Sequence, residues 1–566
     1  MTVTPESDEK TDPAETAEAG SKGPFRILAA DKLAAEGLEY IDSQPDCELV
    51  NKPGLSEDEL AAIAGEHDGM IVRSAVQVTP KVLEKPGRLR VIARAGVGVD
   101  NIDLEAATNA GILVMNSAEA STLSTAEHAW TLLMALARYI GPAYRTMYEG
   151  GWDRSKFSGT QLADKTIGIV GFGRIGRTVA ERALAFDMNV GAYDPFINAR
   201  TMLDGKVKMF RSFDEMLPHA DIVTFHVPLN DETRGMMGKP QFEACRNNLL
   251  IVNAARGGIV DEDEIIPALD AGQCAGVALD VFSEEPPPAD SPLRQHPKVL
   301  CTPHLGASTK EGQKAVSVAA AEQLLEFLRG RGIRGAVNAP GLRVDLTPVQ
   351  QRFVDLAGRM ARLLNPMITR GIAQVNIELQ GEDIIGAAGT IERATLVGLL
   401  ADRFDEPVNV INVRQVAEKR GIKVRSITSE ESGPRGSQLA IEVHGPEGAV
   451  DEKTHPKDRV RRIVGRVYDD LRPRVVEING YYMDMIPAGD MVLLQNEDRP
   501  GMVGMVGGEF GQAEVNIADM AISRRDDTAL MLLKVDNPPG KALISRLKAR
   551  PGILKVSAVR LPGEPK

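Results

Sequence analysis

The stretch KTIGIVGFGRIGRTVAERALAFDMNVGAYD, residues 165–194, carries the strongest structural signal in this chain. It opens with an apolar, largely β-branched run at 166–170, which predicts a strand. Three glycines in GxGxxG spacing follow: Gly171, Gly173 and Gly176. The first allows a tight turn, the second lets a pyrophosphate approach the backbone, and the third permits close packing of helix on strand. The pattern therefore predicts the strand, loop and helix of a dinucleotide-binding site.

The segments after the glycines support the same interpretation. A helical pattern over 177–186 offers free N–H groups at its N-terminus, where a phosphate anion binds well. The next strand ends at Asp194. A carboxylate in this place accepts hydrogen bonds from the adenosine ribose and repels a 2′-phosphate. We therefore expect NAD, rather than NADP, as the cofactor.

Length and composition exclude several classes of protein. A chain of 566 residues with 43% hydrophobic content can form several buried cores, and its net charge of −13 disfavours binding to nucleic acid or to an anionic membrane. Small molecules are the expected partners. The cysteines are scattered, without a CxxC pair or metal-ligand spacing, so we expect no metal, no disulfide and a reducing cytoplasmic location. They are Cys47, Cys245, Cys274 and Cys301.

The N-terminal residues, 1–24, are acidic and contain almost no large apolar side chains. They lack both the basic start and the apolar core of a signal peptide, and they predict a disordered tail. No apolar run reaches the roughly 18 residues that span a bilayer.

Hydrophobic patterns divide the rest of the chain into four candidate domains, of which two precede residue 330. Short strands alternate with helices from Phe25 to about Ser117, which is typical of parallel α/β units. The glycine-loop unit continues through four more apolar runs, DIVTFHV, NLLIVNAA, AGVALDV and KVLCTP, and these predict a six-stranded, doubly wound Rossmann-type sheet. The long helix after Pro303 comes too late for that sheet, so we expect it to return to the first unit.

A glycine-rich linker at 330–341 separates these units from a second α/β region over 342–486. From Met491 the pattern reads strand, helix, strand, strand, helix, strand. This βαββαβ order predicts a ferredoxin-like domain at the C-terminus.

Three ionisable residues follow strand-like runs on the carboxyl side, where open α/β sheets bind ligands: Arg256, Glu285 and His304. Oxidation of a hydroxy acid needs a base for the hydroxyl proton, and histidine suits this role near neutral pH. A carboxylate fixes the imidazole tautomer and stabilises the cation, while arginine binds a substrate carboxylate through two N–H groups. The trio therefore predicts a dehydrogenase site.

Each member of the trio also has an ordinary structural explanation. Arg256 precedes two glycines and could be a turn residue, and Glu285 before prolines could be a solvated helix breaker. A histidine after a proline is often structural, and His226 competes with His304 for the catalytic role. Spacing alone leaves these alternatives open.

The segments GFGRIG, NAARGGIVDED, DVFSEEPP and CTPHLGAST resemble the D-isomer-specific 2-hydroxyacid dehydrogenase family over residues 25 to about 340. The resemblance implies that Arg256 anchors the carboxylate, Glu285 partners the histidine and His304 is the acid/base. It implies a discontinuous, flavodoxin-like substrate-binding domain of 25–120 plus 303–335, which closes on an NAD-binding domain of 121–302. The cofactor positions besides the glycines and Asp194 would be Arg174, Ile175, Val227, Pro228, Ala254, Asp280 and Gly306.

The segments IVRSA, RAGVGVDNIDLEAAT and HLGAST resemble the family members that oxidise 3-phosphoglycerate at the start of serine synthesis. Several cations are suited to a phosphorylated substrate, because phosphate demands charge-assisted donors. The implied substrate-binding residues are Arg73, Ser74, Arg94, Gly96 and Arg138, the last of which reaches its own or a partner's cleft from a long helix. Alternatives are a dehydrogenase for glycerate or 2-hydroxyglutarate and a non-catalytic, NAD-sensing scaffold.

The C-terminal segments MVLLQNEDRPGMVGMV and VNIADMAISR resemble an ACT domain, a small-molecule sensor. This resemblance assigns 487–566 to that domain and implies L-serine as an effector bound near Asn496, Asp498 and Asn516. It places Asp498 and Asn516 near the turn after the first strand of the domain. Residues 342–486 resemble an intervening domain that accompanies it. A homodimer or homotetramer is the expected assembly.

Overall fold

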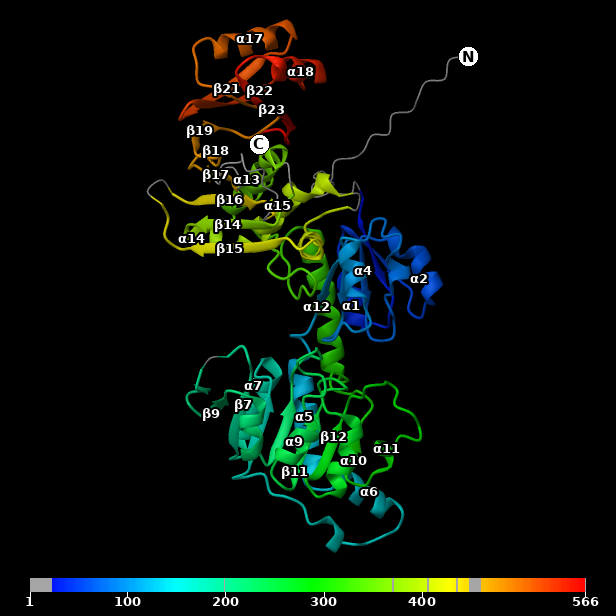
Figure 1. Ribbon diagram of the computed structural model, residues 1–566. Helices are drawn as coiled ribbons and strands as arrows, with labels where there is room; N and C mark the ends of the chain where they lie inside the picture. Colours follow the sequence, from blue (N-terminus) through cyan, green and yellow to red (C-terminus); the bar gives the residue numbers. More distant parts are fainter. Residues whose placement is uncertain are drawn as a thin grey trace.

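The computed structural model describes residues 23–197, 199–368, 371–404, 407–433, 436–446 and 460–564. The predicted tail, 1–24, lies outside these residues except for its last two. Within them the chain forms four β-sheets flanked by helices (Figure 1). None of the helices in this part of the chain is both long and apolar enough to cross a bilayer.

The first domain is built on a five-stranded parallel sheet with the order β2-β1-β3-β4-β5. Helix α12 (Lys310–Leu328) packs against this sheet and against α1 (Ala35–Asp42), so the late helix does return to the first unit, as predicted. The strands are Phe25–Ala29, Cys47–Asn51, Gly69–Val72, Val91–Arg94 and Leu113–Asn116, and the other helices are α2 (Glu57–Ile63), α3 (Pro80–Leu83) and α4 (Leu104–Asn109).

The second domain holds the glycine loop in an eight-stranded sheet with the order β13-β12-β11-β10-β6-β7-β9-β8. All six predicted strands are present, and the doubly wound order confirms the predicted fold class. Two edge strands were missed, β8 (Thr201–Met202) and β9 (Val207–Phe210), because both are short. The six are β6 (Thr166–Val170), β7 (Asn189–Tyr193), β10 (Ile222–Phe225), β11 (Leu249–Asn253), β12 (Cys274–Leu279) and β13 (Val299–Cys301).

Helices cover both faces of this second sheet. The long amphipathic helix expected over about 124–140 is α5 (Thr122–Ala137). Tyr139, whose φ of 52° is left-handed, separates it from a second helix that was not predicted, α6 (Ile140–Tyr148). Helix α5 packs on β11, β12 and α7 (Arg174–Ala185). The remaining helices of the domain are α8 (Phe213–Met216), α9 (Lys239–Ala244), α10 (Glu262–Asp270) and α11 (Pro292–Gln295).

The third domain carries a six-stranded mixed sheet with the order β15-β14-β16-β17-β18-β19. Helices α13 (Pro348–Leu364) and α15 (Ala388–Leu400) pack on one another, with Gly398 close to the Gly358 backbone. The strands are Gln374–Gln380 (β14), Lys423–Ser429 (β15), Gln438–His444 (β16), Val460–Val467 (β17), Pro473–Ile478 (β18) and Tyr481–Met485 (β19), with short helices α14 (Glu382–Ile385) and α16 (Val413–Lys419).

The C-terminal domain has the predicted βαββαβ order and a four-stranded antiparallel sheet, β21-β22-β20-β23. Helices α17 (Met502–Gln512) and α18 (Lys541–Ala549) cover one face of this sheet. The other face joins the core of the third domain through side chains such as Leu493, Leu530 and Leu532. The strands are β20 (Asp490–Glu497), β21 (Ile517–Arg525), β22 (Thr528–Val535) and β23 (Ile553–Arg560).

Buried polar contacts connect the third domain to both of its neighbours. The Arg359 guanidinium donates hydrogen bonds to the carbonyls of Pro487, Pro562 and Gly563, and thereby holds both ends of the C-terminal domain. On the opposite side, Ile411 is buried in the core of the first domain, and Lys419 forms an ion pair with Glu105. The third domain is thus packed between the first and the C-terminal domains (Figure 1).

Candidate active site

The glycine loop has the backbone geometry that close contact with a dinucleotide requires. Gly171 has a φ of +89°, and a Cβ there would lie 2.5 Å from the carbonyl oxygen of His226. A Cβ on Gly176 would lie 2.1 Å from the carbonyl oxygen of Gly171, so the helix can approach the strand only without a side chain. Gly173, by contrast, has open space in front of its Cα at the N-terminus of α7. The loop therefore fits a pyrophosphate at the helix N-terminus.

Asp194 follows β7 and lies directly beside this loop. Its carboxylate accepts hydrogen bonds from the backbone N–H of Phe172 at 2.9 Å and of Phe196 at 3.0 Å. Each oxygen retains a lone pair for a further donor. This arrangement suits the ribose hydroxyls of NAD and disfavours a phosphate in the same place.

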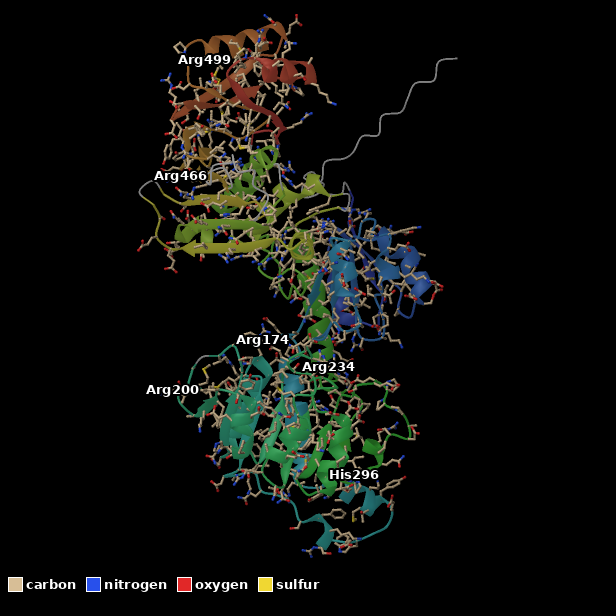
Figure 2. The ribbon with its side chains drawn as sticks, viewed as in Figure 1. Arg174, Arg200, Arg234, His296, Arg466 and Arg499 are labelled. Atoms are coloured by element: carbon tan, nitrogen blue, oxygen red, sulfur yellow. The ribbon has the colours of Figure 1, made fainter. Side chains whose placement is uncertain are left out.

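The other predicted cofactor residues lie along the carboxyl edge of the second sheet. Arg174 and Ile175 open α7, and the Arg174 guanidinium contacts Glu119. Figure 2 shows Arg174, together with Arg234, at the edge of the second domain that faces the first. The rest follow strand ends: Val227 and Pro228 after β10, Ala254 after β11, Asp280 after β12 and Gly306 after β13.

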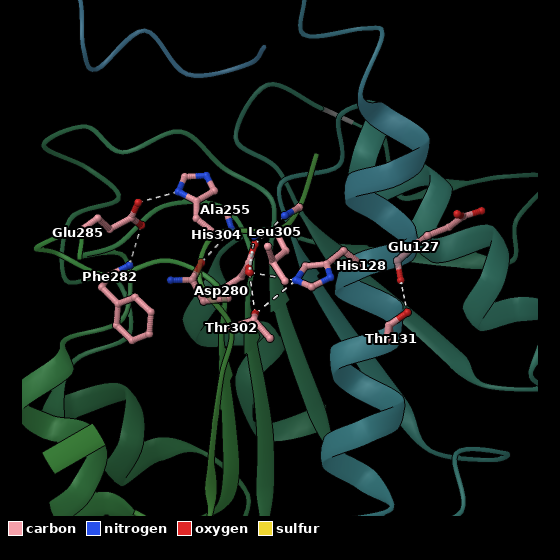
Figure 3. Close-up of polar contacts among 12 residues, drawn as sticks. Glu127, His128, Thr131, Ala255, Asp280, Phe282, Glu285, Thr302, His304 and Leu305 are labelled. Carbon is pink, nitrogen blue, oxygen red and sulfur yellow. Dashed lines mark hydrogen bonds and ion pairs between the residues drawn. The ribbon is translucent and has the colours of Figure 1, made fainter. Parts of the chain in front are cut away.

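His304 and Glu285 meet in the structure, although they come from different loops. The imidazole Nδ1 lies 2.7 Å from Oε2 of Glu285, and the other carboxylate oxygen accepts a hydrogen bond from the Phe282 N–H (Figure 3). A carboxylate on Nδ1 selects the tautomer with the proton on that nitrogen. The Nε2 atom is then free to accept a proton from a substrate.

His226, the competing histidine, lies at the end of β10 with its Nε2 3.1 Å from the Thr224 hydroxyl. Burial lowers the pKa of His226 to about 4, so its ring is neutral at physiological pH. No carboxylate partner comparable to Glu285 is recorded for it among the described residues. The geometry favours His304 as the acid/base.

Arg256 extends from the second domain to the first. Its Nε lies 3.3 Å from the Asp100 carboxylate, and its Nη1 donates to the Ala255 carbonyl oxygen at 2.6 Å. The Asn253 side chain holds the Arg256 backbone carbonyl in place. The guanidinium therefore lies where the two domains meet, as a carboxylate anchor requires.

The predicted substrate-binding residues of the first domain gather near Arg256. Arg94 is largely buried, its Nε has no hydrogen-bond partner, and burial together with the neighbouring Arg256 lowers its pKa to about 10. It remains a cation at neutral pH. Gly96 has a φ of +149° and donates its N–H to Ser117, whereas Arg73 is held by Asp31 through its backbone N–H. Ser74 is exposed beside Arg73.

Arg138 lies apart from this cluster within the chain. It is exposed and caps the C-terminal end of α5. Ten residues separate it from His128 on the same helix, or about 15 Å at 1.5 Å per residue, and His128 is the residue of α5 that reaches the active-site loops. The structure therefore does not bring Arg138 to the cleft of its own chain. Its role in a partner's cleft stays a prediction.

Asp280, a predicted cofactor residue, follows β12 and has several partners within the protein. Its carboxylate is fully buried and accepts hydrogen bonds from the Leu305 and Gly306 N–H groups and from the Thr302 hydroxyl. His128 completes the set, with Nε2 3.0 Å from Oδ1. Burial alone would raise the pKa of Asp280, but these hydrogen bonds, that from His128 foremost, lower it overall. The carboxylate is thus held by groups of the protein, and the role of Asp280 beside the cofactor stays a prediction.

Sequence reasoning missed His128 and Thr302. Both lie in segments whose patterns predict only a helix and a strand end, and nothing local indicates that they share Asp280.

Within the described residues, no cluster of His, Cys, Asp and Glu side chains could hold a metal ion.

The predicted effector residues do not converge within one chain. Asp498 follows β20, next to the β21–β22 turn, and forms an ion pair with Arg524 at 3.3 Å. Asn516 precedes β21 at the opposite end of the sheet, where it donates to Asp536 at 2.7 Å. Eight residues of strand, about 27 Å, separate the two ends. The expectation that Asp498 and Asn516 lie near the same turn is therefore wrong for a single chain.

Asn496 lies on β20, two residues before Asp498, and its side chain is buried. Its Nδ2 donates to the Glu497 carbonyl oxygen, and its Oδ1 has no partner. Of the three predicted effector residues, Asn496 alone therefore offers a buried polar atom without a hydrogen bond. Such an atom is costly unless a ligand or water satisfies it.

Comparison with known proteins agrees with this geometry. Residues 130–306 match the family model of the D-isomer specific 2-hydroxyacid dehydrogenase NAD-binding domain. The second domain thus defines an NAD-dependent oxidoreductase of this class. Residues 349–479 match the intervening domain of D-3-phosphoglycerate dehydrogenases. The D-3-phosphoglycerate dehydrogenases of Archaeoglobus fulgidus and Bacillus subtilis are each 36% identical over 543 residues, which are 95% of this chain and all of the relative. The chain belongs to the D-3-phosphoglycerate dehydrogenase family.

The structure of a dehydrogenase solved with NAD is similar to part of this chain. NAD-dependent formate dehydrogenase from Staphylococcus aureus, in complex with NAD, is 31% identical and superposes with a TM-score of 0.50 over 55% of this chain and 99% of its own. The NAD prediction is confirmed at the level of the domain.

Proposed function

We propose that this protein oxidises 3-phospho-D-glycerate to 3-phosphooxypyruvate with NAD, the first step of phosphorylated serine synthesis. The observation that carries the proposal is the contact between His304 and Glu285 at the same sheet edge as the glycine loop, with Arg256 at the domain boundary. The names of the full-length relatives point to the same substrate.

His304 acts as the base in this reaction. Its Nε2 takes the proton of the C2 hydroxyl while the C2–H bond breaks and a carbonyl forms. Bound NAD supplies the acceptor for the hydrogen of C2 and its electron pair. Glu285 stabilises the imidazolium that results, and Arg256 aligns the substrate carboxylate. Gly173 and the N-terminus of α7 hold the pyrophosphate, and Asp194 holds the ribose.

Arg73 and Arg94 would bind the phosphate in this scheme. Arg94 is partly buried and its Nε lacks a partner, which leaves a donor for an anion, and the Arg73 backbone is fixed by Asp31. Arg73→Gln should raise KM for the phosphorylated substrate about tenfold or more and should change KM for unphosphorylated glycerate little. Lys81→Gln, which removes an exposed cation of the same domain that pairs with Asp58, provides the matched control.

A substrate panel separates the proposal from its rivals. The purified full-length protein would be assayed with NAD and 3-phosphoglycerate, glycerate or 2-hydroxyglutarate. We expect the highest kcat/KM with 3-phosphoglycerate. A preference for another hydroxy acid would assign the chain to a different dehydrogenase, and binding of NAD without turnover of any of the three would favour a sensing scaffold.

We propose L-serine as an effector of the C-terminal domain. The βαββαβ order and the unpaired Oδ1 of Asn496 support a polar ligand there. Because Asp498 and Asn516 lie at opposite ends of the sheet, one serine would need Asp498 from one chain and Asn516 from another. Calorimetric titration of the full-length protein with serine tests this, with Asp498→Ala and Asn516→Ala as single variants. If only one of the two variants loses serine binding, a site shared between two chains is ruled out.

We also propose self-association, as a homodimer or a homotetramer. Helix α6 and the segment after it expose large apolar side chains, Tyr144, Met147, Tyr148 and Trp152. A cavity of about 480 Å³ lies close by, lined by residues such as Leu136, Tyr139 and Leu300. It opens at the end of the sheet remote from His304. Light scattering of Tyr148→Glu and Trp152→Glu should show a smaller assembly than that of the unmodified protein.

The location we propose is the cytoplasm. The four cysteines are unpaired, and burial raises the pKa of Cys274 to about 12 and that of Cys301 to about 11. Thiols held in this way are inert rather than redox-active. Fractionation of the producing cells would test the assignment.

A further inference from the structure

The loop that carries His304 is organised around one buried carboxylate, that of Asp280. Three donors come from the loop itself: the Thr302 hydroxyl at 2.6 Å, the Leu305 N–H at 2.8 Å and the Gly306 N–H at 2.9 Å. The backbone carbonyl of Asp280 also accepts the His304 N–H at 2.9 Å. Residues before and after His304 in the sequence, and the His304 backbone itself, are therefore all bound to Asp280.

His304 itself has a φ of 53°, in the left-handed region. Residues other than glycine adopt this conformation uncommonly, and it persists where the surrounding contacts enforce it. The hydrogen bonds to Asp280 on either side provide that enforcement. The direction of the imidazole toward Glu285 thus depends on the position of the Asp280 carboxylate.

One donor to Asp280 does not belong to the loop. His128, on α5, places its Nε2 3.0 Å from Oδ1 of Asp280 and 3.4 Å from the Thr302 hydroxyl oxygen. Figure 3 shows the His128 ring directed from the helix toward Asp280 and Thr302. Because the carboxylate is fully buried, loss of this side-chain donor would leave it under-satisfied.

We propose that His128 is a positioning residue for the catalytic histidine. It fixes the Asp280 carboxylate from the side of α5, and Asp280 in turn fixes the left-handed turn that points His304 at Glu285 and at the substrate hydroxyl. The inference rests on the proposed function, since it deepens the account of how the same site transfers a proton. His128 does not touch the substrate.

Two variants of similar volume test this role. His128→Gln keeps a side-chain N–H donor at about the reach of Nε2, and His128→Met fills the space without a donor. We expect His128→Met to lower kcat about 10- to 100-fold, because small misplacement of a catalytic group costs rates of this order. KM for NAD should change less than about threefold. His128→Gln should restore kcat to within about threefold of the unmodified protein.

The matched controls lie on the same helix and point away from Asp280. The Thr131 hydroxyl donates to the Glu127 carbonyl oxygen (Figure 3). The Glu127 side chain pairs with Arg182. Thr131→Ala and Glu127→Gln should retain kcat. A loss of kcat in these controls equal to that in His128→Met would show that α5 acts only through general stability and would overturn the proposal.

A second measurement keeps the test decisive if His128→Met folds poorly. Asp280→Asn removes the charge that His128 binds. His128→Leu, which also lacks a donor, should lower kcat on its own about as much as His128→Met, but the double variant Asp280→Asn with His128→Leu should lose little more activity than Asp280→Asn alone. Equal kcat in His128→Met and the unmodified protein, additive losses in the double variant, or a failure of His128→Gln to restore kcat would each refute the role of His128.

These outcomes are distinct from a failure of the proposed function. Turnover of 3-phosphoglycerate by the unmodified protein tests the substrate, whereas the ratio of kcat between His128→Gln and His128→Met tests the positioning. That ratio can be measured with whichever 2-hydroxy acid the unmodified protein oxidises. An unexpected substrate would leave the ratio meaningful.

Discussion

Arg256 of the second domain and Asp100 of the first form an ion pair across the domain boundary, with Nε of the guanidinium 3.3 Å from the carboxylate. A Cβ on the neighbouring Gly98 would overlap the Arg256 guanidinium, so the two domains meet closely at this point. Asp100 thus lies where it competes with a substrate carboxylate for the same cation.

Asp100→Asn should therefore strengthen substrate binding. Removal of the carboxylate leaves Arg256 without its paired anion, so KM for the anionic substrate should fall severalfold at low ionic strength and less at high salt. Steady-state kinetics at two salt concentrations measure the effect. An increase in KM would show instead that the ion pair serves to hold the domains together.

His304→Ala should lower kcat by about 10² to 10⁴, since a positioned general base contributes a factor of this size. The affinity for NAD should change little, because the predicted cofactor contacts lie on other loops. Glu285→Gln keeps the side-chain volume and should cost less than His304→Ala. Single-turnover kinetics together with NAD titration distinguish the two effects, and near-normal turnover by His304→Ala would remove this residue from the mechanism.

Asp194→Ala should narrow the preference for NAD over NADP. The substitution removes two ribose hydrogen bonds and the repulsion of the 2′-phosphate. It also removes the acceptor for the Phe172 N–H, so thermal stability must be measured alongside. The ratio of kcat/KM for the two cofactors is the test, and equal efficiency of the unmodified protein with both would contradict the assignment.

Arg359→Met should destabilise the third and C-terminal domains together. Three carbonyl oxygens, those of Pro487, Pro562 and Gly563, lose their donor, at a cost of about 2–4 kcal/mol. Because the two domains share a core, both should unfold in one transition at a lower Tm. Two separate transitions in the unmodified protein would contradict a common folding unit.

The C-terminal domain should also lose stability in acid through Glu509. Hydrogen bonds from Arg546 and Arg550 lower the pKa of Glu509 below its usual value of 4.5. A carboxyl whose folded pKa is depressed stabilises the fold above its unfolded pKa, and this contribution disappears as the pH falls through the folded pKa. Denaturation of the unmodified protein and of Glu509→Gln between pH 6 and pH 3 should show a flatter dependence for the variant. Parallel curves would contradict this role.

Local patterns in the sequence determined the fold class and much of the candidate site. The glycine spacing specifies a backbone, because only glycine fits the close approaches found at Gly171 and Gly176. The βαββαβ order follows from hydrophobic periodicity alone. Arg256, Glu285 and His304 could be found because each directly follows a strand, and parallel strands bring their carboxyl ends to one edge.

Other features depend on residues far apart in the sequence or on the direction of a strand, and only the tertiary structure decided these. His128 contacts Asp280 only because α5 packs on β12, which no local pattern records. The antiparallel run of β21 carries Asn516 away from Asp498, and the burial of one sheet face against the third domain makes two predicted domains share a core. Periodicity indicates that a face is apolar, but the identity of the surface that covers it depends on how the whole chain packs.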